Sequence, residues 1–137
     1  MNRRHFLATA AAIAILPMRS SAGETVEYTP GLIQQALAEG KTVFVDYSAT
    51  WCSTCARQHR VITELRAQNP AYEQMLFVNV DWDTYANHEV TTSRNIPRRS
   101  TLLILKGDQE YGRIVAGTGV DEIKALLDTG LALTQAS

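Results

Sequence analysis

The sequence predicts an α/β fold in which one central mixed sheet carries helices on both faces. Helical apolar periodicity alternates with short apolar runs along the chain, which is the pattern of strands joined by crossover helices. A turn at residues 106–109 separates the last two apolar runs and predicts an antiparallel hairpin at one side of the sheet. The length of 137 residues, 45% of them hydrophobic, suits one small domain.

The first part of the predicted domain holds two helices and one strand. Apolar residues share one helical face over residues 30–39, and Gly40 ends that helix. The run TVFVDY at residues 42–47 is short, apolar and rich in β-branched and aromatic residues, which indicates a buried strand. A second helix is predicted over residues 52–68, because apolar residues recur on one face until Pro70 stops the pattern.

The remaining elements are predicted from the same periodicities. We expect strands over residues 75–80, 101–105 and 111–116, and helices over residues 85–94 and 120–127. The run TLLIL is the strongest strand signal in the chain. The expected order is therefore α-β-α-β-α-β-β-α, with early parallel pairing and a final antiparallel edge.

The first 22 residues differ in composition from the rest and predict an export signal. Arg3 and Arg4 precede an apolar stretch over residues 6–16, and small residues at 20 and 22 are placed as a cleavage site. The paired arginines resemble the twin-arginine signal type; a general secretory signal and an uncleaved amphipathic anchor are the alternatives. We therefore divide the chain into a signal peptide, 1–22, and a domain, 23–137. Cleavage would leave ten basic and 14 acidic residues, a net charge of −4.

The chemistry of the chain centres on ATWCSTC, which contains its two cysteines. Cys52 falls where a strand ends and a helix begins, and helix N-termini stabilise a thiolate. Cys55 lies one turn further along the same helical face. We expect Cys52 to attack disulfides and Cys55 to resolve the mixed disulfide. A bond across so short a loop would stabilise the fold only weakly. A zinc or iron site using both cysteines and His59 is the alternative, but a closed zinc site needs four ligands. His59 is predicted to lie on the helix surface.

These residues resemble the thioredoxin superfamily. The segment VFVDYSATWCSTC, residues 43–55, looks like the family's active-site strand and turn, and FVNVD and TLLILKG look like two of its other strands. The resemblance covers residues 30–127. It implies that Asp46 is a buried acid that assists proton transfer at the resolving cysteine; a strand-end acid capped by water is the alternative. Because Trp51 stands next to an exposed nucleophile, we expect it to form the flat apolar rim that meets protein substrates, with ordinary core packing as the alternative.

The chain departs from the family pattern at two places near the cysteines. Ser53 and Thr54 stand between them instead of Gly-Pro, which argues against an ordinary cytosolic thioredoxin. We place Ser100, rather than Pro97, at the position of the family's cis-proline. That register puts Arg99 beside Cys52, where its charge would stabilise a thiolate. Arg99 and Ser100 would then help to hold the substrate.

The predicted function is that of an exported, periplasmic thiol–disulfide oxidoreductase in which Cys52 and Cys55 exchange a disulfide with protein thiols. We favour the reducing direction. The expected partners are protein dithiols and disulfides, with a membrane redox protein as one candidate electron donor. A monomer is expected, with neither a dissociable cofactor nor a resident metal. A formal net charge of −1 gives no bulk attraction to nucleic acid. The alternative is a redox-inert binding or chaperone module with the same fold.

Overall fold

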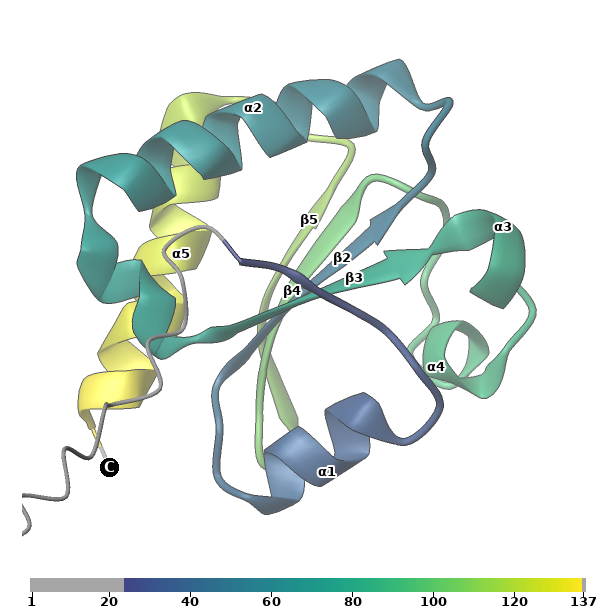
Figure 1. The fold of residues 1–137 in the computed structure, drawn as a ribbon, viewed down its shortest axis with the longest axis horizontal. Coiled ribbons are helices and arrows are strands. Elements are labelled where there is room, and N and C mark those ends of the chain that lie inside the picture. The colour runs from purple at the N-terminus through teal and green to yellow at the C-terminus, as the bar shows by residue number, and fades with distance from the viewer. Residues whose placement is uncertain (1–23, 137) are drawn as a thin grey trace, which may run out of the picture.

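The structure, a computed structural model, describes residues 24–136 (Figure 1). The proposed signal peptide and its boundary with the domain therefore lie outside the described residues. The strands are β1 (Val26–Glu27), β2 (Val43–Ser48), β3 (Leu76–Asp81), β4 (Thr101–Lys106) and β5 (Gln109–Val115). The helices are α1 (Leu32–Ala38), α2 (Ser53–Gln68), the 3-10 helix η1 (Pro70–Gln74), α3 (Trp82–Tyr85), α4 (Glu89–Thr92) and α5 (Val120–Gln135).

The five strands form one mixed sheet in the order β1-β3-β2-β4-β5. Strands β1, β3 and β2 run parallel, while β4 is antiparallel to both β2 and β5. Strand β2 is central and buried along its whole length. The turn after its carboxyl end leads directly into α2. In α/β sheets ligands bind at the carboxyl ends of the strands, and this turn lies there. The predicted mixed sheet is confirmed.

Helices cover both faces of the sheet, and strand alternation assigns side chains to each face (Figure 1). Val43, Val45 and Tyr47 of β2 join the core beneath α1, α3 and α4. Phe44 of β2 joins the core beneath α2, η1 and α5. Because successive side chains on a strand point to opposite faces, Asp46 lies on the same face as Phe44, beneath α2.

The structure differs from the sequence prediction at several elements. The helix expected over residues 85–94 is wrong in extent: α3 ends at Tyr85, and only the short helix α4 lies within that range. The chain turns between the two helices, and the His88 side chain caps α4 by accepting the Val90 amide at 3.0 Å. Strand β1 and η1 were not predicted; two residues and a single 3-10 segment are too short for periodicity to register.

Helix α5 continues well past its predicted end at residue 127. Its late turns contain Gly130, where a β-carbon would come within 2.3 Å of the Met75 sulfur and 2.8 Å of the Ile104 side chain. Glycine therefore allows the helix to lie close against the sheet and η1. Within residues 24–136, no helix has the length and apolar character that crossing a membrane requires.

Candidate functional site

The two cysteines occupy the first turn of α2. Cys52 is the N-cap residue, in extended conformation, and its sulfur accepts the amide of Cys55 at 3.2 Å. Both are free thiols, with exposures of 5% for Cys52 and 1% for Cys55. A cap residue satisfies one of the helix amides that lack an intrahelical partner. Here the sulfur takes that role, so the backbone itself stabilises negative charge on Cys52.

Ser100 lies against both sulfurs from the loop before β4. Its Oγ is 3.2 Å from Cys52 Sγ and 3.0 Å from Cys55 Sγ, and the residue is fully buried. Its φ of 65° is in the left-handed region, which is costly for a residue with a β-carbon. Pro97 is exposed and lies three residues earlier in the loop. Ser100, not Pro97, therefore faces the cysteines.

This environment separates the acidities of the two thiols. Burial alone would raise the pKa of Cys52, but hydrogen bonds from the Cys55 thiol, the Ser100 hydroxyl, the Cys55 amide and Arg99 outweigh it and lower that pKa to about 7. Burial, followed by the neighbouring Cys52, raises the pKa of Cys55. Near neutral pH the first thiol is therefore partly ionised while the second holds its proton. That difference suits a nucleophile followed by a resolving group.

Gln58 holds the Ser100 loop in place and was not predicted as a site residue. It is fully buried on the inner face of α2, and its amide nitrogen donates to the carbonyl of Ser100 at 3.0 Å and to that of Gly117 at 2.9 Å. The Ser100 amide donates to Tyr47 of β2 at 2.6 Å. The sequence held one signal for this role: Gln58 follows Cys55 by three residues, so the two side chains lie on the same face of the helix.

Trp51 is the exposed aromatic residue beside the cysteines, with 59% of its surface accessible. Its indole nitrogen donates to the Asp83 carboxylate at 3.0 Å. The Arg99 guanidinium lies 4.4 Å from the centre of its ring, a cation–π contact. The structure thus brings Trp51, Arg99 and Cys52 together on one surface. Asp83, which accepts the hydrogen bond of the indole, is part of this cluster.

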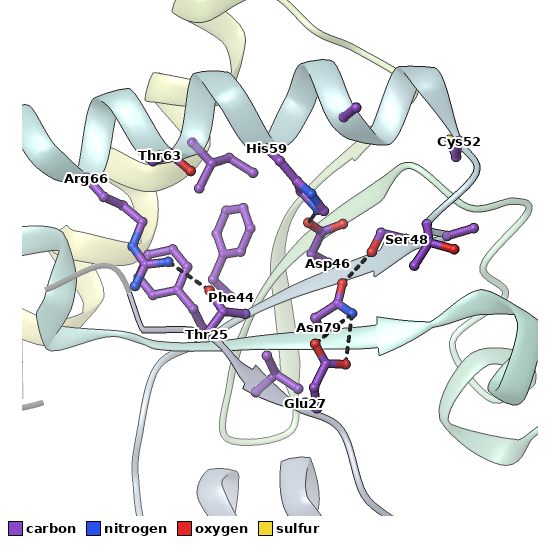
Figure 2. Close-up of a pocket in the computed structure, with 16 residues that line it drawn as sticks. Thr25, Glu27, Phe44, Asp46, Ser48, Cys52, His59, Thr63, Arg66 and Asn79 are labelled. Atoms are coloured by element: carbon purple, nitrogen blue, oxygen red, sulfur yellow. Dashed lines mark hydrogen bonds and ion pairs between the residues drawn. The ribbon is translucent and has the colours of Figure 1, made fainter. Parts of the chain in front are cut away.

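Asp46 is buried beneath α2 and pairs with His59 (Figure 2). His59 Nε2 lies 2.7 Å from Asp46 Oδ2. Burial raises the pKa of Asp46, and the hydrogen bond from His59 opposes that effect in part. The prediction that His59 is a helix-surface residue is therefore incomplete: its side chain is 49% exposed, yet one ring nitrogen reaches the buried acid. Within residues 24–136, no cluster of three or more His, Cys, Asp and Glu side chains could hold a metal ion.

Comparison with known proteins places this site in a family. The family model described as Thioredoxin matches residues 24–129. Rice thioredoxin H2-1 is 32% identical over 65% of this chain, and rice thioredoxin H5 is 28% identical over the same share. The chain spans 60% and 62% of the length of these two relatives. The crystal structure of Trxlp from Edwardsiella tarda is 33% identical, with a TM-score of 0.63 over 76% of this chain and 96% of that one. With its fold, its C-x-x-C pair and the match over residues 24–129, the chain belongs to the thioredoxin family.

Proposed function

We propose that the protein is a thiol–disulfide oxidoreductase that acts on disulfides in other proteins. One observation carries the proposal. The Cys52 sulfur sits at the N-terminus of α2 with the Cys55 amide and the Ser100 hydroxyl directed at it. Hydrogen bonds to a charged acceptor stabilise the charged form, which is the nucleophile in disulfide exchange.

The reaction conserves electrons between two dithiol–disulfide couples. The Cys52 thiolate attacks one sulfur of a substrate disulfide, that S–S bond breaks, and the first substrate thiolate leaves and takes a proton. Cys55 then gives up its proton and attacks Cys52 Sγ. The mixed disulfide breaks, the second substrate thiol leaves, and a Cys52–Cys55 disulfide remains. Two electrons have passed to the substrate, and another dithiol protein must return them.

The surrounding residues supply position and proton transfer. Asp46, buried beneath α2, takes the proton from the resolving cysteine. Trp51 offers an exposed apolar face beside Cys52 and, with Arg99 and Ser100, holds the substrate polypeptide. The contact between Arg99 and the Trp51 ring supports this role, because it fixes the orientation of both side chains at the rim.

We favour the reducing direction. A strongly oxidising pair has a nucleophilic cysteine with a pKa of roughly 3.5, whereas a reducing pair has one near 7. The pKa of about 7 for Cys52 supports a thiolate that is stabilised only moderately. The reduced form is then not strongly favoured over the Cys52–Cys55 disulfide, which is the property of a reductant. The arginine beside Cys52 acts in the oxidising direction but does not dominate.

The compartment and the partners are proposed from the sequence. The arginine pair and apolar stretch within residues 1–22 support export to a bacterial periplasm, with loss of the signal on the way. A membrane dithiol protein is then a suitable electron donor, and we propose that the enzyme works as a monomer. Expression of the full chain with a C-terminal tag, followed by fractionation and mass measurement, tests this. A cytoplasmic protein whose mass still includes residues 1–22 would refute export.

Insulin reduction by dithiothreitol tests the activity itself. The protein should accelerate precipitation of the insulin B chain, and the Cys52→Ser variant should not. A redox-inert binding module would give no acceleration with either protein. The direction is tested by equilibrating the Cys52–Cys55 pair with glutathione. A potential near roughly −270 mV supports the reductant, and one near roughly −120 mV would show an oxidant.

A further inference from the structure

A cavity of about 490 Å³ runs along α2 on the β3 side of β2 (Figure 2). The Ser100 loop lies on the other side, where β4 pairs with β2. Cys52 lines one end of the cavity and Arg66 lines the other, with Asp46 and His59 between them (Figure 2). The nucleophilic cysteine and the buried acid therefore share a space that is separate from the surface formed by Trp51 and Arg99.

The floor of this cavity contains a row of polar side chains, which the register of three adjacent strands places side by side. Asp46 of β2 pairs with Asn79 of β3, and Asn79 pairs with Glu27 of β1. Asn79 accepts a hydrogen bond from Ser48 and donates to the two Glu27 oxygens at 3.0 and 3.3 Å. These contacts occupy Asn79 within the row. The hydrogen-bond partner of the Asp46 carboxylate therefore comes from α2, above the sheet.

His59 is that partner, and it joins Asp46 to solvent. Its Nε2 is 2.7 Å from Asp46 Oδ2, while Asp46 Oδ1 is buried without a hydrogen-bond partner among the described residues. The His59 side chain is 49% exposed. A proton on the carboxyl can therefore pass to a ring whose other edge reaches water. Histidine suits this transfer because it gains and loses a proton near neutral pH.

The charged groups around the pair favour a protonated ring. The hydrogen bond to Asp46 raises the pKa of His59, burial opposes it, and the charges of Asp46, Cys52 and Glu27 add to the increase. Glu27 faces the pair from β1, and Cys52 lies on α2. Asn79 on β3 is neutral. Arg66, further along α2, is engaged by Glu73 at 2.8 Å.

We propose that His59 carries the proton between Asp46 and solvent during disulfide exchange, through the cavity on the β3 side of β2. This rests on the proposed function. When Cys55 resolves the mixed disulfide, its proton goes to the Asp46 carboxylate; neutral His59 takes it from Asp46 and releases it to water. In the opposite direction the same groups return it. His59 acts through Asp46 and is a positioning and relay residue.

The first test compares His59→Gln and His59→Ala with Arg60→Gln, an exposed control on the same helix. Reduced protein is mixed with excess small disulfide, so that attack by Cys52 is not limiting, and formation of the Cys52–Cys55 disulfide is followed against pH. Because only neutral imidazole can take the proton from Asp46, the wild-type rate should rise through the titration of His59. The His59→Gln variant should lose that rise and be about tenfold slower on the alkaline side. This is less than the roughly 10²–10⁴-fold contribution of a group that transfers the proton at the reacting atoms, because His59 acts through Asp46.

Chemical rescue distinguishes proton transfer from a structural effect. Added imidazole should restore the rate of His59→Ala in proportion to its concentration, and should leave the Arg60→Gln control unchanged. A rate and pH profile of His59→Gln equal to those of the wild type would overturn the proposal. So would a slow His59→Ala variant that imidazole does not rescue.

A second readout needs no turnover, and so separates this proposal from the proposed function. The pH titration of the Asp46 carboxyl is followed by carbon NMR in wild type and His59→Gln. Because a positive His59 opposes the burial effect, the Asp46 midpoint should move upward in the variant. An unmoved midpoint would show that the pair does not form in solution. If the midpoint moves but the wild type fails to reduce insulin, the oxidoreductase proposal fails while the pairing stands.

Discussion

Removal of the Ser100 hydroxyl should raise the pKa of Cys52. A hydrogen bond to a charged group contributes about 1.5–3 kcal/mol, and one pKa unit corresponds to about 1.36 kcal/mol. The Ser100 hydroxyl is 3.2 Å from Cys52 Sγ and can donate to it once that thiol ionises. Ser100→Ala should therefore raise the Cys52 pKa from about 7 by about one to two units.

The same substitution should make the pair more reducing, and increasingly so at high pH. The hydroxyl stabilises the thiolate, which exists only in the reduced protein, so its loss destabilises the reduced form. If the Cys52 pKa rises by one unit from about 7, the reduction potential of the pair falls by roughly 8 mV at pH 7 but by roughly 28 mV at pH 9. At pH 9 Cys52 is mostly ionised in both the wild type and the variant. The pH dependence separates this effect from a general change in disulfide strain.

The assay is the rate of iodoacetamide alkylation against pH, with two matched variants beside Ser100→Ala. Ser100→Gly also lacks the hydroxyl but relieves the left-handed φ of 65°, so it should raise the pKa equally while differing in stability. Thr101→Val removes a neighbouring hydroxyl that donates to the Arg98 carbonyl at 2.7 Å, not to sulfur, and should leave the pKa unchanged. Equal shifts in Ser100→Ala and Thr101→Val, or none in either Ser100 variant, would refute the reasoning.

Three further predictions concern the neighbours of this site. Cys55→Ser should accumulate a mixed disulfide between Cys52 and the substrate, visible by mass spectrometry, because no resolving thiol remains; release of both substrate thiols would contradict the assigned order of attack. Arg99→Gln should raise the Cys52 pKa by less than one unit in the same alkylation assay, since a partly exposed charge is screened, and the difference should shrink with added salt. Gln58→Met should lower the free energy of unfolding in urea by about 2–4 kcal/mol, because two loop carbonyls lose their donor, whereas exposed Gln68→Met should change it by less than about 0.5 kcal/mol.

Much of the cysteine site could be predicted from sequence because its geometry is local. A buried strand followed by a short turn and an amphipathic helix fixes Cys52 at a helix N-terminus and Cys55 one turn later. The resemblance also put Ser100 at the position of the family's cis-proline, immediately before the strong strand signal that begins at Thr101. In both cases a few covalent steps connect the predicted residue to a well-marked element, so small errors in element boundaries do little harm.

The partners of Asp46 and Trp51 could not be predicted in the same way. His59 and Asp83 reach them across the fold, 13 and 32 residues away in sequence. Whether they meet depends on how α2 is rotated over the sheet and on where the chain turns after β3. Amphipathic periodicity gives the inner face of α2 but not which polar residue at the border of that face turns inward. The second turn of α2 shows this, since Gln58 points into the core and His59 points into the cavity, toward Asp46 (Figure 2).

Because β2 lies at the centre of the sheet, different side chains act on the acidities of Cys52 and Asp46 from its two sides. Ser100 reaches the cysteines from the β4 side, whereas His59 meets Asp46 over the β3 side. A change in the Ser100 loop therefore acts on the thiolate from the β4 side, and a change at His59 acts on Asp46 from the β3 side. Cys52, which lines the cavity and raises the pKa of His59, couples the two. Since substrates approach the Ser100 side in the proposed mechanism, a bound polypeptide would cover the nucleophile yet leave the proton path open to water. The resolving step takes place while the substrate is still bound, so the path of the proton must differ from the path of the substrate.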